Sequence, residues 1–256
     1  MTTKGILMSG PMVRALLDGS KTQTRRVLKL PKQSNLRGDW EASTIGGHGC
    51  TLSDGTPYPE RVCISHTGTG YTLIPPLSVG DRLYVREAHA YHGTGWCNQT
   101  PDETKVRVEY LADNQDVEFI VPTKDVENFI PKQNKPKSLM VEEVTGDSDY
   151  DRALAQENWL ADWWTRQKKR PPMFMFRHWS RLWLEVTDVR VQRVQDITEE
   201  DAVAEGVAAW AGTAPPPRPA FMGLWDSLHD QTGHHWKTNP WVAAYTFTVH
   251  RGNVDE

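Results

Sequence analysis

The sequence predicts a protein of the α+β class: a small, mostly β barrel with a few short helices and two long insertions. Three observations support this. Hydrophobic residues alternate with polar ones over several segments, the longest being 182–194, as expected for half-buried strands. Helical periodicity is confined to short segments with capping residues. Residues 31–78 and 113–178 show no lasting period, so we expect both to be insertions within a single domain spanning 1–256.

The N-terminal part predicts a helix followed by a strand. In "SGPMVRALLDGSK", Ser9 can cap a helix, Pro11 sits early where a missing N–H costs little, and Gly19 can provide a left-handed stop. "TQTRRVLKL" then has the character of a strand. Further strands are expected at 82–86, in "DRLYVRE", and at 106–110. "DRALAQENWLADWWTRQKK" predicts a helix inside the second insertion.

The C-terminal part is the most regular. In "RLWLEVTDVRVQRV" the alternation changes phase at Thr187-Asp188, which indicates a bulge that bends the strand, as a small barrel requires. "DITEEDAVAEGV" predicts a short helix with Thr198 as N-cap and Gly206 just beyond its end. A proline-rich linker, "GTAPPPRPA", precedes an amphipathic helix in "FMGLWDSLHD", and "NPWVAAYTFTVH" predicts a final strand.

Composition excludes several functional classes. The formal charge of −4 gives no general field for binding polyanions. No apolar run approaches the ~20 residues of a membrane span, and the N-terminus lacks a secretory signal, so we expect no membrane partner. Three cysteines do not make a disulfide framework, and we expect a cytoplasmic protein with reduced thiols.

The run Lys21-Thr22-Gln23-Thr24 is the first candidate site. A threonine hydroxyl becomes a nucleophile when a base takes its proton, and a lysine can do so when burial lowers its pKa. Two intervening residues at a helix-to-strand turn can bring Lys21 and Thr24 to one pocket. The alternative is a polar turn with a solvated lysine.

Two further positions carry candidate carboxylates. Glu205 lies at the end of a short helix between Ala204 and Gly206, where small neighbours allow close approach, and a partly buried carboxyl there could serve as a general acid. An exposed helix-end glutamate is the alternative. Arg86 and Glu87 follow a strand and form either an ion pair or a substrate contact.

Metal and cofactor signals are weak. His48, Cys50, Cys63 and His66 are zinc-type ligands, but their spacing is not a strong signature, so we predict no metal site. His229, His234 and His235 are explained by a wet loop. The sequence contains neither a glycine-rich phosphate-binding loop nor a G-x-S-x-G nucleophile elbow, and no cofactor is expected.

Taken together, these segments resemble the ASCH family, relatives of the PUA-like RNA-binding barrels. "LLDGSKTQTRR" is similar to that family's G-x-K-T-x-T-x-R opening, on which the following residues fall: Gly19, Lys21, Thr22, Thr24 and Arg26. "VGDRLYVRE" resembles its G-D-x-L strand start, and Glu205 takes the place of its distal acidic residue. The C-terminal part looks like the long form met in bacteriophages and prophages. The resemblance covers about 110–130 residues in separated blocks, outside 31–78 and 113–178.

The resemblance implies a small, mostly antiparallel PUA-like β-barrel and an amidohydrolase activity. Small bacterial members of the family remove the acyl group from N4-acetylcytidine. Carried over to this chain, this implies Lys21 as proton acceptor, Thr24 as nucleophile and Glu205 as proton donor. We further predict a small nucleoside or base as substrate, and as substrate-binding residues Thr22, Arg26, Arg86, Glu87 and Trp241. The alternatives are a module that binds single-stranded RNA or modified nucleic acid, with Arg25 in the same groove, and a single-strand ribonuclease.

Overall fold

The computed structural model describes most of the chain, in these ranges: 1–31, 37–93, 103–122, 169–207 and 216–255. Within it the chain divides into two compact units. The first unit joins Met1–Arg86 to Ser180–Glu256, and the second comprises Glu87–Trp179. The single ASCH domain over the whole chain stays a prediction.

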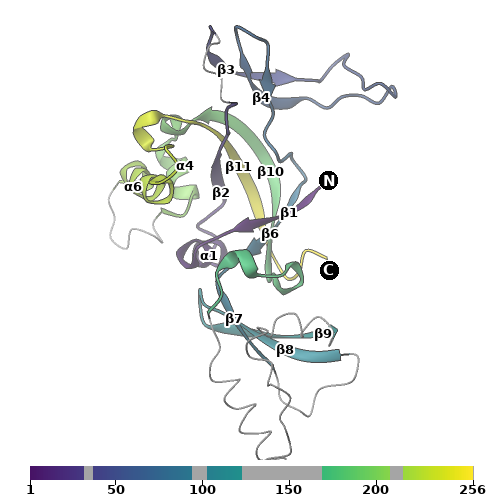
Figure 1. Cartoon of the computed structure of the whole chain (residues 1–256), viewed down its shortest axis with the longest axis vertical. Coiled ribbons are helices and arrows are strands. Elements are labelled where there is room, and N and C mark those ends of the chain that lie inside the picture. The colour runs from purple at the N-terminus through teal and green to yellow at the C-terminus, as the bar shows by residue number, and fades with distance from the viewer. Residues whose placement is uncertain (32–36, 94–102, 123–168, 208–215, 256) are drawn as a thin grey trace, which may run out of the picture. The chain divides into compact units, whose positions relative to one another are not determined.

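A five-stranded sheet forms the first unit. Its strands, in spatial order, are β1 (Thr3–Leu7), β6 (Arg82–Arg86), β10 (Leu182–Arg193), β11 (Trp241–Arg251) and β2 (Gln23–Val27). The β1–β6 pair is parallel and the other pairs are antiparallel. In Figure 1, β10 and β11 are long, strongly curved strands. The α+β class with mostly antiparallel sheets is therefore confirmed, while the strand pairings of the described residues leave this sheet open at β1 and β2.

The curvature of the sheet has a local cause in β10. The register between β10 and β11 shifts between Val186 and Asp188, which confirms the predicted bulge. Val186 pairs with Phe247 before the shift, and Val189 pairs with Tyr245 after it. Because a bulge increases local twist and bend, the two long strands curl over the core.

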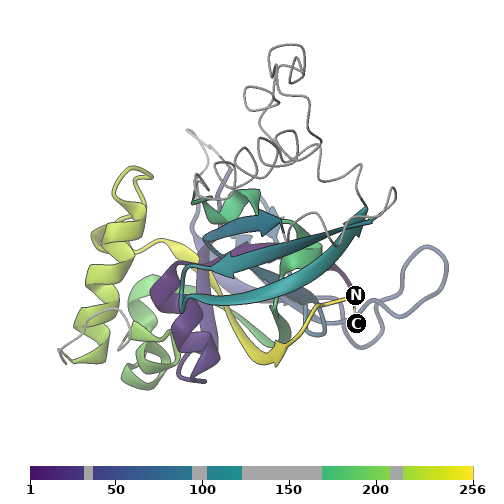
Figure 2. The same cartoon turned by 90° about the horizontal axis from the view of Figure 1, so that it is seen from below.

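Three helices contact this sheet, all confirming predictions. Helix α1 (Gly10–Leu17) buries one face of the helix in the core, although Ser9 at its N-cap makes no side-chain capping bond. Helix α4 (Glu199–Ala204) is capped by Thr198, whose Oγ1 accepts from the Asp201 N–H at 3.1 Å. Helix α6 (Pro217–His229) lies beside α4 near β2 (Figures 1 and 2). It begins within the predicted linker, whose residues up to 215 lie outside the described part.

The first predicted insertion is not irregular. It contains β3 (Trp40–Ile45), β4 (Arg61–His66) and β5 (Thr72–Leu73), which form an antiparallel sheet. The expectation of a loop was wrong because β3 is not buried on either face, so its sequence carries no alternation of hydrophobic and polar residues. The sequence reading also missed β1, where only Ile6 is buried.

The second unit is built on three antiparallel strands, β7 (His89–Gly93), β8 (Glu103–Tyr110) and β9 (Gln115–Pro122). The expectation of irregular structure after residue 113 is therefore wrong for β9, in which the side chains of residues 115–118 and 120 are exposed. The predicted helix at 151–169 lies, up to residue 168, outside the described residues.

Short 3-10 turns complete the described elements: Pro172–Phe174, Arg177–Trp179, Val194–Asp196 and Trp236–Thr238. Across the described ranges no helix has both the length and the apolar character needed to cross a bilayer.

Candidate functional site

Lys21 and Glu205 meet through their backbones as well as their side chains. The N–H of Lys21 donates to Ala15 O at 2.9 Å, and the N–H of Thr22 donates to Ala204 O at 2.8 Å. The first bond holds the turn against α1 and the second attaches it to the end of α4, and Lys21 and Glu205 form an isolated antiparallel bridge. The turn after α1 and the end of α4, which are distant in sequence, are thus joined at Lys21 and Glu205, two of the predicted catalytic residues.

Gly206 allows this close contact. Its φ of +77° lies in the left-handed region, which favours glycine. A Cβ at this position would lie 3.0 Å from the Cβ atoms of both Ala15 and Lys21. The small residues that flank Glu205 in the sequence therefore serve the approach of α4 to the turn.

The Lys21 ammonium uses all three of its hydrogens. Nζ donates to Glu205 Oε2 at 3.0 Å, to the Glu205 carbonyl oxygen at 2.8 Å and to the Gln23 carbonyl oxygen at 2.8 Å. Both side chains are almost fully buried, at 3% and 6% exposure. The alternative of a solvated lysine in a wet turn is wrong for this structure.

Burial changes the proton affinity of Lys21. Desolvation lowers its pKa, and this outweighs the attraction of the Glu205 carboxylate; the charges of Arg26 and Arg25 lower the pKa further. A lysine in such a setting gives up its proton more readily than one in water, which is the property required of a base.

Arg25 and Asp201 extend the cluster, and sequence reasoning missed their part in it. Arg25 Nη1 donates to Glu205 Oε1 at 3.0 Å, and its Nη2 donates to Asp201 Oδ2 at 2.6 Å. Arg190 of β10 holds the other oxygen of Asp201 at 3.1 Å. Burial raises the pKa of Asp201, but the hydrogen bond from Arg190 and the charge of Arg25 outweigh it and leave the pKa below its ordinary value. The only signal in the sequence was the doubled arginine.

Thr24 lies next to this cluster without a hydrogen bond to it. It is 5% exposed and pairs with Tyr245 across β2 and β11. Its hydroxyl makes no hydrogen bond to another described residue. Because Lys21 Nζ lies 2.8 Å from the carbonyl oxygen of Gln23, the residue bonded to Thr24, standard peptide dimensions put Nζ within roughly 6 Å of the Thr24 Cα.

The other predicted binding residues are more dispersed. Thr22 and Arg26 are exposed beside the pair, and Arg26 Nη2 reaches Leu7 O on β1 at 3.4 Å, a long hydrogen bond between the two edge strands. Arg86 lies on β6 opposite Leu7. Glu87 is buried in the second unit. Trp241 is 7% exposed, with the Arg193 guanidinium 4.5 Å from its ring centroid.

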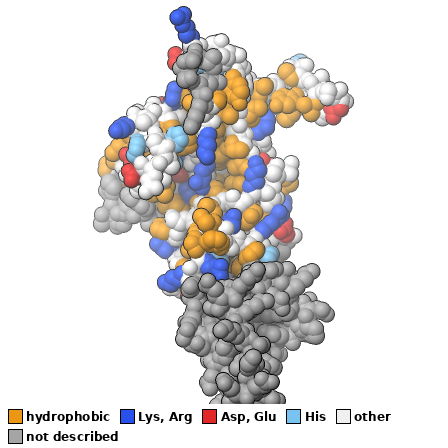
Figure 3. Space-filling view, viewed as in Figure 1, with side chains coloured by type: hydrophobic (Ala, Val, Ile, Leu, Met, Phe, Trp, Pro, Cys, Tyr) orange, Lys and Arg blue, Asp and Glu red, His pale blue; other side chains and the backbone are white. Residues whose placement is uncertain are grey.

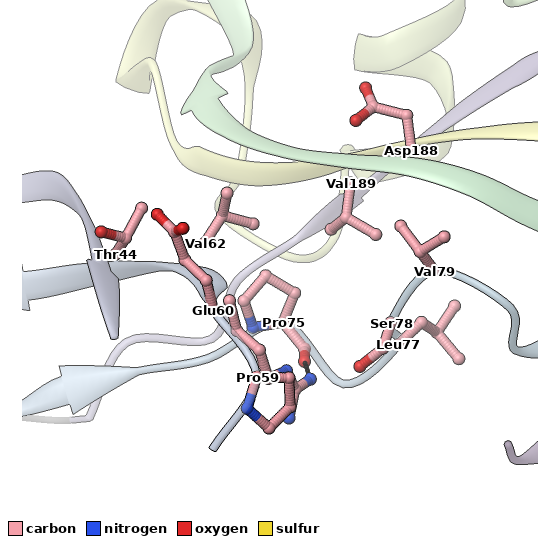
Figure 4. Close-up of a pocket in the computed structure, with 11 residues that line it drawn as sticks. Thr44, Pro59, Glu60, Val62, Pro75, Leu77, Ser78, Val79, Asp188 and Val189 are labelled. Carbon is pink, nitrogen blue, oxygen red and sulfur yellow. Dashed lines mark hydrogen bonds between the residues drawn. The ribbon is translucent and has the colours of Figure 1, made fainter. Parts of the chain in front are cut away.

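A pocket of about 480 Å³ lies on the first unit, and Figure 4 shows its walls. Val189, after the bulge of β10, points into it. Val189, Tyr245 and Thr24 are successive cross-strand neighbours, so their side chains share one face of the sheet. Two strand spacings of about 4.8 Å separate Val189 from Thr24. The other lining residues are Thr44, Pro59, Glu60, Arg61, Val62, Pro75, Leu77, Ser78, Val79 and Asp188.

Tyr245 lies between Val189 and Thr24 in the sheet, and its side chain carries a buried hydroxyl. It is buried near the Leu77 backbone, yet no hydrogen bond of ordinary geometry reaches it from the described residues. Burial raises the pKa of Tyr245 to about 12. A neutral phenol with an unused donor thus lies on the face that carries Thr24.

The candidate zinc ligands do not gather. Within the described ranges, no three His, Cys, Asp or Glu side chains are grouped so as to hold a metal ion. Cys50 is exposed, whereas Cys63 is buried, and the Nδ1 atom of His66 lies 3.0 Å from Thr69 Oγ1.

Comparisons of the chain with protein-family models, with curated proteins and with solved structures found no match.

Proposed function

We propose that this protein is an amidohydrolase that removes an acyl group from N4-acylated cytidine or a related modified nucleoside or base. The observation that carries the proposal is the buried contact at 3.0 Å between Lys21 Nζ and Glu205 Oε2, with Thr24 three residues after Lys21, on strand β2. An amine and a carboxyl in contact, with a hydroxyl nearby in the chain, are the kinds of group that nucleophilic amide hydrolysis requires.

The ion pair can supply both an acid and a base from one proton. Transfer of a proton from Lys21 Nζ to Glu205 Oε2 converts ammonium and carboxylate into amine and carboxylic acid. Burial favours this neutral form because both charges are poorly solvated. The amine then accepts the Thr24 proton as Oγ1 attacks the acyl carbon, and the acid protonates the departing N4 as the C–N bond breaks.

Hydrolysis of the acyl-threonine restores the starting state. Loss of the amine product leaves Lys21 as ammonium and Glu205 as carboxylate. Glu205 takes a proton from the attacking water while Lys21 returns one to Thr24 Oγ1, and the acid leaves. The last proton moves from Glu205 back to Lys21, so atoms and charge balance over the cycle.

The proposed architecture is the PUA-like barrel of the ASCH family. The curved five-stranded sheet supports it, because Arg26 on β2 reaches the Leu7 carbonyl on β1 and so brings the two open edges near each other. A small-molecule substrate is compatible with the pocket beside Val189, whose volume falls in the range of ligand sites of ~300–1,000 Å³. Its lining residues do not include Lys21, Thr24 or Glu205, and its link to the site is the sheet face that Val189 shares with Thr24.

Incubation with N4-acetylcytidine tests the proposal through the ultraviolet change and the release of acetate. We expect turnover by the wild-type protein and loss of at least about 100-fold with Thr24→Val, since the nucleophile is removed. Thr248→Val, which removes an exposed threonine hydroxyl from β11, is the matched control and retains turnover. Full activity of Thr24→Val, or no activity of the wild type, refutes the proposal.

Binding of single-stranded RNA is the second candidate. Figure 3 shows Lys and Arg side chains interspersed with hydrophobic ones over the viewed face of the first unit. Sites for single-stranded nucleic acid combine positive side chains, which contact the phosphates, with aromatic rings, on which the bases stack. Affinity that falls steeply with salt would support it, and cleavage of the RNA that is lost in Lys21→Ala would identify a ribonuclease instead.

A further inference from the structure

The buried cluster contains a residue outside the resemblance to the ASCH family. Arg25 is fully buried, and its two terminal nitrogens hold two different carboxylates. One is Glu205, through Oε1, and the other is Asp201 on α4. The Phe221 ring of α6 lies 5.9 Å from the guanidinium carbon. The Arg25 side chain therefore extends from β2 and contacts both α4, with the Glu205 that follows it, and α6.

The charges along this cluster alternate. Starting from Lys21, the order of contacts is Lys21, Glu205, Arg25, Asp201 and Arg190, so that each cation lies between or beside anions. The cluster passes from the buried turn to solvent, because Arg190 is 42% exposed whereas Arg25 is not exposed at all. Interactions at the buried end are screened least, so the charge of Arg25 acts on the pair beside it with little screening.

Each oxygen of Glu205 has its own cation. Oε2 accepts from Lys21 and Oε1 accepts from Arg25, both at 3.0 Å. Because the Arg25 guanidinium is rigid and planar and is also bound to Asp201, it determines the direction in which Oε2 points. Its positive charge also opposes a proton on Lys21.

We propose that Arg25 is a positioning residue that orients Glu205 toward Lys21 and keeps the ammonium of Lys21 ready to release its proton. The inference rests on the proposed function for its catalytic consequence, but its effect on Lys21 is independent of the substrate. The charged groups that face Lys21 are Glu205 from the end of α4 and Arg25 and Arg26 from β2. Asp201 contacts Arg25, and Arg190 contacts Asp201, so both lie farther along the cluster from Lys21.

The direction of the effect follows from these charges. Replacing Arg25 with glutamine removes a positive charge close to the ammonium while Glu205 remains, so the pKa of Lys21 rises, by about one unit. The base form of Lys21 then appears at higher pH. The rising limb of kcat/KM against pH moves up by the same amount, so turnover at pH 7 falls about tenfold and recovers in more alkaline buffer.

Two measurements test the proposal on the full chain. The pKa of Lys21 is taken from the pH dependence of its ¹³Cε NMR signal, assigned by its absence in Lys21→Met. The kcat/KM for N4-acetylcytidine is recorded over the same pH range. We expect Arg25→Gln to move both by about one unit. Lys29→Gln removes one positive charge from an exposed position near β2 and serves as the control, with neither quantity moved.

The variant Arg25→Lys separates the effect of Arg25 on the orientation of Glu205 from the effect of its charge on Lys21. It also tests the proposal if Arg25→Gln does not fold. An ammonium keeps the charge but cannot hold two carboxylates in a planar fork. We expect the Lys21 pKa to stay near that of the wild type while kcat falls about tenfold and KM is unchanged. A kcat equal to that of the wild type overturns the proposal, as does an unchanged Lys21 pKa in folded Arg25→Gln. A Lys21 pKa that moves as expected in a protein without turnover refutes the proposed function and leaves the role of Arg25 intact.

Discussion

Replacing Glu205 with glutamine removes a buried negative charge that Lys21 and Arg25 share. The exposures of the three side chains are 6%, 3% and 0%, so water cannot take over the lost interactions. Each charge-assisted hydrogen bond contributes roughly 1.5–3 kcal/mol, and removing one partner of a buried pair costs about 3–5 kcal/mol. We therefore expect Glu205→Gln to lower the free energy of unfolding by about 4 kcal/mol at pH 7.

The penalty has a pH dependence whose sign the structure determines. Burial already lowers the pKa of Lys21, and the loss of Glu205 removes the attraction that opposes this. A lysine whose pKa is lower in the folded than in the unfolded chain releases protons on folding. Stability therefore rises with pH between the folded pKa of Lys21 and its ordinary value of 10.5. The penalty of Glu205→Gln should shrink from pH 7 to pH 9.5.

Urea denaturation followed by tryptophan fluorescence measures both effects. The double variant Lys21→Met/Glu205→Gln is the control, because removing both members of a buried pair costs less than removing one. We expect it to recover at least half of the lost free energy. A loss below about 1 kcal/mol for Glu205→Gln would show that the cluster is solvated. A penalty independent of pH would show that Lys21 does not lose its proton.

Three further predictions concern the surroundings of the pair. Gly206→Ala should lower the free energy of unfolding by about 1–2 kcal/mol from its left-handed φ alone. The loss should be larger in total because the added Cβ meets the side chains of Ala15 and Lys21. Gly55→Ala, where φ is similar but the space is open, should show only the loss from φ in the same urea titration. Because the pKa of Asp201 is lowered in the fold, its contribution is complete above 3.8 and is lost as the pH falls through the folded value. In acid titrations by circular dichroism, Asp201→Asn should therefore lose less stability between pH 5 and pH 2 than the wild type; an unchanged slope contradicts this. Tyr245→Phe should change stability by less than about 1 kcal/mol, because its buried hydroxyl has no hydrogen bond to lose; a larger loss in thermal unfolding would reveal a partner for it.

Local patterns predicted the elements that bury one face. Thr198 and Gly206 marked the ends of α4, and the phase change at Thr187-Asp188 marked the bulge in β10. Each of these signals acts over a few residues, so the chain carries it without reference to the fold. The sequence did not predict β3 and β9, because strands with mostly exposed side chains need no alternation of hydrophobic and polar residues. The backbone hydrogen bonds that form such strands depend on neighbouring strands, which the local sequence does not specify.

The candidate site divides in the same way. The sequence alone predicted Lys21, Thr24 and Glu205 as site residues and placed the first two across one helix-to-strand turn. Only the tertiary structure decided that Lys21 and Glu205, 184 positions apart, lie in contact. It also decided that Arg25 pairs with the second oxygen of Glu205 and with Asp201. The physical reason is that desolvation and ion pairing depend on neighbours in space. The sequence around a lysine does not show whether water or a carboxylate surrounds its ammonium group in the folded protein.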